Sequence, residues 1–226
     1  MKYLFALIIV LLSLTFAFGQ TEQSPIVEKE LNYADWTYKD VRTGEDVNLR
    51  KFAKGSKLTI VVYFAPWCPN WRHDAPMLQR LYDQYKGNGL RMIGVGEYDR
   101  VATMTTNLDT LKVTFPVVYE SESRTDRQKT HHYEYRQATG DTRGWGSPWY
   151  IMLMPSTIEK KGDILTKKTF VINGEMIQTE GEQFIRKHLG MPATAALVPA
   201  AATGKIEACD PNDKTAELKA PEKAAK

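Results

Sequence analysis

Two cysteines are the residues of this 226-residue sequence best suited to covalent chemistry, and they stand at Cys68 and Cys209. Cys68 follows the apolar, β-branched run of residues 57–64 and precedes a stretch with helical spacing that ends near residue 86. A strand is therefore expected to end, and a helix to begin, at this thiol. The free N–H groups and positive dipole end of a helix start stabilise a thiolate. The position predicts a reactive thiol, unless the surrounding tryptophans bury it and disfavour its charged form.

Cys209 is the other thiol of the chain, and its place in the sequence limits what it can do. Two cysteines permit at most one disulfide bond. A flexible chain from residue 190 to Cys209 has a root-mean-square reach of roughly 25 Å, so Cys209 can approach Cys68. Two interpretations stay open: a distant resolving thiol that forms a disulfide with Cys68, or an unpaired thiol without consequence.

The remaining ionisable side chains show no spacing that indicates a site. The histidines lack the spacing of metal ligands, and they are His73, His131, His132 and His188. Asp74 and Glu97 have no partner that the sequence indicates, so they are interpreted as solvated charges. The sequence therefore predicts no metal and no cofactor.

Hydrophobic periodicity predicts the elements that position Cys68. The expected strands span residues 34–40, 47–49, 57–64, 90–95, 115–119, 149–154 and 167–172. The expected helices span residues 68–86, 100–111, 124–137 and 182–189. Strands that alternate with helices predict parallel pairing in an α/β sheet. The pair Asn173–Gly174, between two apolar runs, is typical of a tight β-hairpin turn.

The first residues have the pattern of a secretory signal peptide. Residues 1–19 hold Lys2, an uncharged apolar run, and the small residues Ala17 and Gly19, so cleavage is predicted between Gly19 and Gln20. A membrane anchor is the alternative, but the run is short for a bilayer span. A periplasmic or secreted location is expected, with no stable membrane span after cleavage.

The rest of the chain divides by composition. Residues 20–30 are polar and are expected to form a flexible leader, and residues 31–190 form one globular domain. Residues 191–226 are rich in Ala, Pro, Lys and Glu, and this composition predicts disorder. The net charge of +3 is spread over the chain. A dispersed charge gives no basic patch, so nucleic acid is not an expected partner.

The run Val-Tyr-Phe-Ala-Pro-Trp-Cys-Pro-Asn-Trp-Arg at residues 62–72 resembles the redox site of TlpA/ResA-type exported thioredoxins. In that family an apolar strand leads into Trp-Cys-x-x-Cys-Arg and then into a proline-containing helix. The hairpin around Trp36, the loop 146–149 and the segment 171–175 match further parts of the family pattern in the right order. The resemblance implies a thioredoxin fold, with a central mixed sheet flanked by helices and an N-terminal β-hairpin extension. The disordered C-terminal tail is expected from its composition alone.

The same resemblance assigns roles around Cys68, which takes the position of the nucleophile. A cis-proline is implied at Pro148, facing the sulfur, with the backbone of Ser147 offered to an extended peptide. The residues expected to support the site are Trp67, Pro69, Trp71, Arg72, Ser147, Pro148 and Trp149. The departure from the family is Trp71, which stands where the second cysteine belongs. Because an indole cannot resolve a mixed disulfide, the ordinary dithiol route does not carry over.

Two functions follow from these observations. The first is thiol–disulfide redox activity through a single active-site cysteine, which forms mixed disulfides with exported client proteins or small thiols. The alternative is a redox-inactive thioredoxin-fold module that binds a protein or an extended peptide. A thiol peroxidase is disfavoured, because peroxiredoxins place a threonine three residues before the cysteine, where this chain has Ala65.

Overall fold

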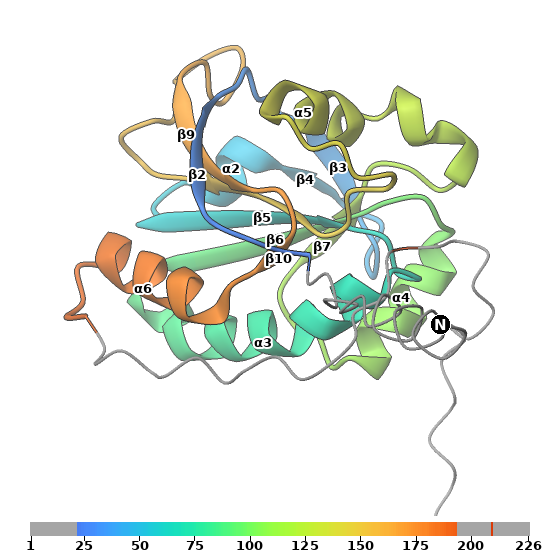
Figure 1. The fold of residues 1–226 in the computed structure, drawn as a ribbon, viewed down its shortest axis with the longest axis horizontal. Coiled ribbons are helices and arrows are strands. Elements are labelled where there is room, and N and C mark those ends of the chain that lie inside the picture. Colours follow the sequence, from blue (N-terminus) through green and yellow to red (C-terminus); the bar gives the residue numbers. More distant parts are fainter. Residues whose placement is uncertain (1–21, 194–208, 210–226) are drawn as a thin grey trace, which may run out of the picture.

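The computed structural model describes residues 22–193 and Cys209, and its central feature is a mixed sheet covered on both faces (Figure 1). The eight strands that the described residues contribute lie in the order β2 (Val27–Glu30), β9 (Lys168–Ile172), β8 (Trp149–Leu153), β5 (Leu58–Phe64), β6 (Leu90–Gly96), β7 (Val117–Tyr119), β3 (Thr37–Asp40) and β4 (Asp46–Asn48). β5, β6 and β7 run parallel, and the other neighbouring pairs are antiparallel. The expected mixed α/β sheet is therefore confirmed.

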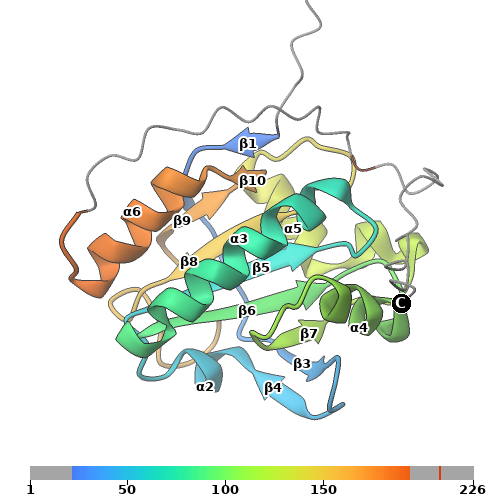
Figure 2. The ribbon, with the colours of Figure 1, turned by 90° about the horizontal axis from the view of Figure 1, so that it is seen from below.

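The helices cover the two faces of this sheet. Their bounds are α2 (Leu49–Ala53), α3 (Pro69–Tyr85), α4 (Val101–Thr110), α5 (His131–Thr139) and α6 (Gln178–Leu189), with 3₁₀ turns η1 (Lys86–Asn88) and η2 (Arg124–Lys129). α3, α4 and α6 pack on one face, and α2 and α5 pack on the other (Figures 1 and 2). No helix in the described part of the chain is long and apolar enough to cross a bilayer.

β5 is the centre of the fold, and every residue in it is buried. Side chains alternate across a strand. Ile60, Val62 and Phe64 therefore enter the core beneath α3, whereas Val61 and Tyr63 enter the core beneath α5. The almost wholly apolar run at residues 58–64 was expected to form a strand buried on both faces, and this expectation is confirmed.

The N-terminal segment corrects one expectation. Residues 22–30, expected to belong to a flexible leader, contain β1 (Gln23–Ser24) and β2. β2 pairs with β9 and forms that edge of the large sheet, and β1 pairs with β10 (Glu175–Met176) in a separate two-stranded sheet. The polar sequence concealed these strands because edge strands alternate exposed and half-buried side chains.

The expected hairpin at Asn173–Gly174 is also wrong. β9 and β10 flank this turn, but β10 pairs with β1 rather than folding back on β9. A Cβ atom at Gly174 would lie 2.1 Å from the carbonyl oxygen of Glu22, so the glycine admits the incoming N-terminal segment. Gly174 is therefore needed for the close approach of the backbone at Glu22, and not for a hairpin turn.

Other boundaries shift less. The helix expected at 124–137 divides into η2 and α5 at Thr130, whose hydroxyl accepts a hydrogen bond from the N–H of Tyr133 and caps α5. The predicted signal peptide, residues 1–19, lies outside the described residues. So does most of the predicted disordered tail, residues 191–226.

Candidate functional site

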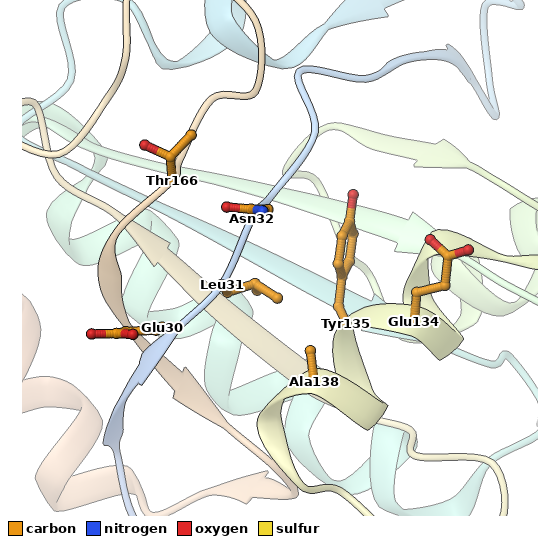
Figure 3. Close-up of a pocket in the computed structure, with 7 residues that line it drawn as sticks. All are labelled: Glu30, Leu31, Asn32, Glu134, Tyr135, Ala138 and Thr166. Carbon is orange, nitrogen blue, oxygen red and sulfur yellow. The ribbon is translucent and has the colours of Figure 1, made fainter.

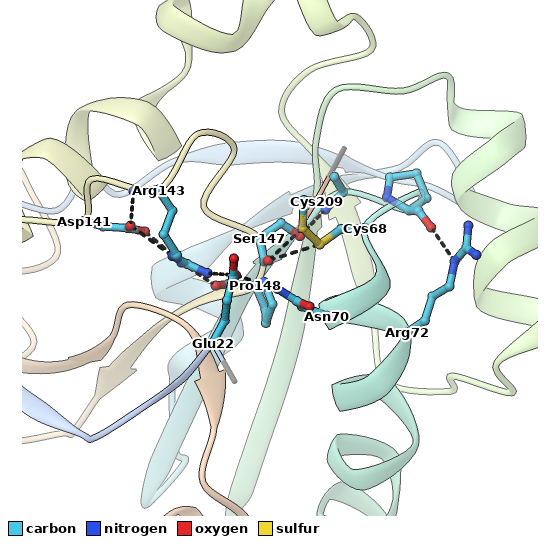
Figure 4. Close-up of a disulfide and its surroundings, with 11 residues drawn as sticks. Glu22, Cys68, Asn70, Arg72, Asp141, Arg143, Ser147, Pro148 and Cys209 are labelled. Carbon is cyan, nitrogen blue, oxygen red and sulfur yellow. Dashed lines mark hydrogen bonds and ion pairs between the residues drawn. A yellow bond between two sulfur atoms is a disulfide. The ribbon is translucent and has the colours of Figure 1, made fainter. Parts of the chain in front are cut away.

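Cys68 is the N-cap residue of α3, at the point where the chain leaves β5. Its side chain is buried and joined in a disulfide to Cys209, which is half-buried and lies 141 positions further along the chain. The two sulfur atoms lie 3.1 Å and 3.3 Å from the carbonyl oxygen of Ser147 (Figure 4). The structure thus brings Cys68, Cys209 and Ser147 together.

The loop that faces the disulfide is held by the strand that leads to Cys68. The peptide bond between Ser147 and Pro148 is cis. The backbone N–H of Ala65 donates to the buried hydroxyl of Ser147 over 2.9 Å. This bond fixes the Ser147 carbonyl beside the sulfur atoms. Once the disulfide is reduced, that carbonyl is an acceptor within reach of the Cys68 thiol.

Trp71 lies in the core rather than on the site surface. Its indole is fully buried and stacks on Phe64, with ring centroids 3.9 Å apart. The indole N–H donates to the side-chain oxygen of Asn107 over 2.9 Å, and the Asn107 amide donates to the carbonyl of Pro66 over 2.9 Å. The position that holds a second thiol in the TlpA/ResA pattern is therefore a packed anchor between α3, α4 and the loop before Cys68.

Two expected supporting residues lie away from the sulfur atoms. Arg72 extends on the other side of the start of α3 from Ser147, and its Nε donates to the carbonyl of Pro66 over 3.4 Å (Figure 4). Trp149 is the first residue of β8 and packs in the core beneath α5, where its ring contacts Tyr63. Pro69 occupies the first helical position. A backbone N–H there has no partner within the helix, so the missing N–H of proline costs the helix no hydrogen bond.

Two arginines of the segment 121–144 lie over tryptophan rings that flank the candidate site. Trp67 meets Trp145 edge-on, with centroids 5.1 Å apart. The guanidinium groups of Arg124 and Arg127, both on η2, lie 5.0 Å from the ring centres of Trp67 and Trp145. Guanidinium groups over indole faces are attractive. The segment therefore positions Trp67, which precedes the nucleophile position, as well as the loop before Pro148.

A buried ion pair stabilises the loop that leads to Pro148. Arg136 of α5 is fully buried and pairs with Asp141 over 2.9 Å. Arg143 pairs with the same carboxylate over 2.7 Å and donates to the carbonyl of Pro148 over 2.9 Å. A Cβ atom at Gly146 would lie 1.7 Å from Nε of Arg136, and Gly146 has φ +60°. Only glycine fits at this position. A glycine directly before Ser147–Pro148 is therefore the one sequence signal from which the close approach of Arg136 could be inferred.

α5 is held at its start by an acidic residue from the end of β7. The carboxylate of Glu120 accepts hydrogen bonds from the N–H groups of His131 (2.6 Å) and His132 (3.2 Å). The His131 ring lies 3.2 Å from the same carboxylate. Burial pushes the pKa of Glu120 upward, but the hydrogen bonds with His131 and Glu97, together with the nearby His132, outweigh it and bring the pKa to about 2. Glu120 is therefore an ionised cap for α5.

The interpretation of Asp74 and Glu97 as solvated charges is wrong. Both side chains are buried, with exposed fractions of 2% and 0%. Burial raises the pKa of Asp74, and burial together with the neighbouring Glu120 carboxylate raises the pKa of Glu97 well above its usual range. Sequence periodicity missed them because a carboxylate at the end of a buried strand, or on the core side of a helix, looks the same in sequence as an exposed one.

A surface pocket of about 410 Å³ lies elsewhere, between β2 and α5 (Figure 3). It is lined by Glu30, Leu31, Asn32, Glu134, Tyr135, Ala138 and Thr166. These side chains offer two carboxylates but no thiol. The candidate chemistry is therefore centred on the disulfide and the Ser147–Pro148 loop.

Comparisons with solved structures agree with this fold. The chain is similar to a putative thiol:disulfide interchange protein DsbE from Chlorobium tepidum, with 20% identity, a TM-score of 0.51, and coverage of 72% of this chain and 98% of that one. A secreted thiol-disulfide isomerase from Corynebacterium glutamicum has 14% identity, a TM-score of 0.52, and coverage of 72% and 92%. DsbF from Mycobacterium tuberculosis has 18% identity, a TM-score of 0.50, and coverage of 71% and 99%. These likenesses show the thioredoxin fold.

No curated protein matches the sequence. A family model does, and it spans more than half of the chain. The AhpC/TSA model covers residues 30–177, from the end of β2 to the start of α6, and so includes Cys68, Trp71 and the cis-proline loop. The chain is therefore a member of the AhpC/TSA family with a thioredoxin fold.

Proposed function

We propose that this chain is a thiol–disulfide redox protein in which Cys68 is the nucleophile and Cys209 is the resolving thiol. The disulfide between these two residues, with both sulfurs against the Ser147 carbonyl, is the observation that carries the proposal. Trp71 removes the ordinary resolving position, and the C-terminal tail supplies a thiol in its place. The solved structures with this fold include one described as a putative thiol:disulfide interchange protein and one described as a secreted thiol-disulfide isomerase, which agrees with this chemistry.

The reaction begins with the reduced protein. The Cys68 thiolate attacks a client disulfide, one client sulfur leaves as a thiolate and takes up a proton, and a mixed disulfide joins Cys68 to the client. The Cys209 thiolate then attacks the sulfur of Cys68, and the second client sulfur leaves and is protonated. The client gains two electrons and two protons, and the protein is left with its Cys68–Cys209 disulfide. An external dithiol must reduce that bond before the next cycle.

The start of α3 favours this direction of attack. Cys68 is the N-cap residue of a 17-residue helix, so its thiolate lies at the positive end of the helix dipole. Cys209 has no such position. Cys68 is therefore the better nucleophile towards a client and the better leaving group when its bond to Cys209 is broken.

The Cys68–Cys209 disulfide also limits when a client can reach Cys68. Cys68 is fully buried in the oxidised protein, whereas Cys209 is half-buried. Once the disulfide is reduced, the Cys209 side chain must move away from the Ser147 carbonyl before a client disulfide can reach Cys68. We expect the clients to be disulfides of exported proteins or of small thiols, in the periplasm or outside the cell, where disulfides persist. The predicted signal peptide and the secreted relative from Corynebacterium glutamicum favour that location.

The test is the intact mass of protein isolated without reductant, measured before and after reduction. The expected oxidised protein is lighter by two hydrogen atoms, and peptide mapping joins Cys68 to Cys209. In Cys209→Ser, Cys68 should instead carry a small-thiol adduct or a client, and in Cys68→Ser the Cys209 thiol should alkylate at the rate of a free peptide thiol. Two free thiols that alkylate slowly in the wild type would refute the redox proposal.

That refuting result would favour the second candidate, a redox-inactive module that binds an extended peptide. Its support is the burial of Cys68 and the packed indole at Trp71. Peroxide turnover is not expected. Ala65 offers no hydroxyl three residues before the cysteine, and its N–H is already bonded to Ser147.

A further inference from the structure

A separate group of metal-ligand side chains lies where α3 passes β10 (Figure 2). His73 and Asp74 are neighbours on α3, and Glu175 is the first residue of β10. One nitrogen of His73 and one oxygen from each carboxylate lie within 4.8 Å of one another. None of the three residues takes part in the redox steps proposed above.

The distances from His73 to the two carboxylates suit a small divalent cation. Nδ1 of His73 is 3.7 Å from Oδ1 of Asp74 and 3.4 Å from Oε2 of Glu175. Ligand atoms bound tetrahedrally at the usual zinc distances are about 3.4 Å apart. The imidazole is half exposed, with 51% of its side chain accessible, so it can turn towards a metal without disturbing the core.

The carboxylate of Glu175 provides a second observation, independent of the distances, that points to a bound cation. Its side chain is fully buried, and neither carboxylate oxygen has a hydrogen-bond partner among the residues that the structure describes. A buried carboxylate without hydrogen bonds is costly unless a proton or a cation compensates it. Oε2 is directed towards the His73 ring, so the unmet oxygen faces the other ligand atoms.

The surroundings fix the carboxylate of Asp74 and the backbone of Glu175 in place. Oδ2 of Asp74 accepts hydrogen bonds from the hydroxyl of Tyr150 and from the N–H of Met176, the latter over 2.9 Å. These bonds leave Oδ1 on the side of His73. The N–H of Glu175 donates to the carbonyl of Glu22 over 2.9 Å and anchors the backbone of that ligand. Hydrogen bonds of this kind orient carboxylate ligands in metal sites.

We propose that His73, Asp74 and Glu175 bind a divalent first-row transition-metal cation, with one imidazole nitrogen and two carboxylate oxygens as ligands. An imidazole favours Zn²⁺ and its neighbours over Mg²⁺ and Ca²⁺, which prefer oxygen ligands alone. The exposed side of His73 leaves room for water as a fourth ligand. The site is thus a partly open one at the surface of α3.

The experiment is calorimetric titration of the full chain with ZnCl₂, using untagged protein whose thiols have been counted and blocked by alkylation. Blocking matters because free thiolates bind zinc, and it keeps the result independent of the redox proposal. The expected result is one saturable site. His73→Ala and Glu175→Gln should each weaken Zn²⁺ binding by more than about tenfold, and excess Mg²⁺ should not displace the metal.

The matched control is His188→Ala, which removes a half-buried imidazole whose Nδ1 faces the Phe184 carbonyl. It should bind Zn²⁺ as the wild type does. His73 is half exposed, so its replacement leaves the fold intact even if Glu175→Gln does not. Absence of saturable binding in the wild type, or unchanged affinity in His73→Ala, would overturn the proposal.

Discussion

The indole N–H of Trp71 donates to the side-chain oxygen of Asn107, 2.9 Å away, and this bond ties the start of α3 to α4. Trp71→Ala should lower the free energy of unfolding by about 3–5 kcal/mol, because it removes a fully buried indole. Trp71→Phe keeps an aromatic ring against Phe64 but leaves the buried oxygen of Asn107 without its donor. Its expected cost is about 1–3 kcal/mol.

Urea denaturation of the two variants measures both costs. The Cys68–Cys209 bond should still form in Trp71→Phe, since no atom of the indole contributes to it. If Trp71→Ala is as stable as the wild type, the residue is not the packed anchor described above.

The tail disulfide should stabilise the domain. Loop-closure entropy for a separation of 141 residues gives an upper limit of about 5 kcal/mol, from which the cost of ordering the segment around Cys209 must be subtracted. Cys209→Ser is therefore expected to unfold at lower denaturant concentration than the oxidised wild type. Dithiothreitol should lower the midpoint of the wild type to that of the variant and leave the variant unchanged. A wild-type midpoint that does not respond to reductant would contradict the prediction.

Gly146 tests how the loop before Pro148 is supported. Gly146→Ala places a methyl group 1.7 Å from Nε of Arg136 at a residue with φ +60°, so it should cost at least about 2 kcal/mol and loosen the loop beside Cys68. Gly140→Ala is the matched control, because Gly140 also has positive φ, at +81°, but no atom lies within 4 Å of an added Cβ. Its expected cost is the backbone strain alone, about 1 kcal/mol. Equal costs for the two variants would show that Arg136 does not confine the loop.

The pair of Glu120 and His131 predicts how stability depends on pH. The pKa of Glu120 is lowered to about 2, so the stability it contributes is present above its ordinary value and is lost as the pH falls towards 2. The hydrogen bond with Glu120 raises the pKa of His131, so its contribution is complete below the ordinary histidine value and is lost as the pH rises through the raised pKa. Stability from this pair should therefore be greatest in mildly acidic solution.

Thermal unfolding across the pH range measures this dependence. His131→Gln should flatten the decline on the alkaline side, while His188→Gln, which alters a ring that faces a backbone carbonyl, should not. The effect of His131 is expected to be small, because about half of its side chain is exposed and solvent screens the pair. An unchanged alkaline decline in His131→Gln would exclude the pair as its cause.

The parts of the fold that the sequence predicted are those with local patterns. The run ending at Phe64 is apolar on both faces, and the helix after Cys68 has regular spacing, so periodicity was sufficient to place both. The pairing of β1 with β10 left no such pattern. It depends on Gly174 admitting the chain at Glu22, a contact between segments about 150 residues apart.

The candidate site likewise has one part that the sequence predicted and another that it did not. The strand-to-helix junction at Cys68 is visible in the sequence, but its partner is not, since nothing in a run of Ala, Pro and Lys distinguishes a tail thiol that pairs from one that does not. The burial of Asp74 and Glu175 likewise depends on how β10 crosses α3. Composition and spacing describe neighbours along the chain, whereas these groups become neighbours only through the tertiary fold.

The bond between Cys68 and Cys209 closes a covalent ring that contains most of the domain but leaves β1 to β5 outside it. If the oxidised protein were pulled by its two ends, the force would pass through the sulfur atoms and bypass the chain between them. The helices and strands from α3 to α6 would carry no direct load, and the stretched molecule would be shorter than its reduced form by about 500 Å. Reduction of one bond would thus add the residues between the two sulfur atoms to the part of the chain that bears the force.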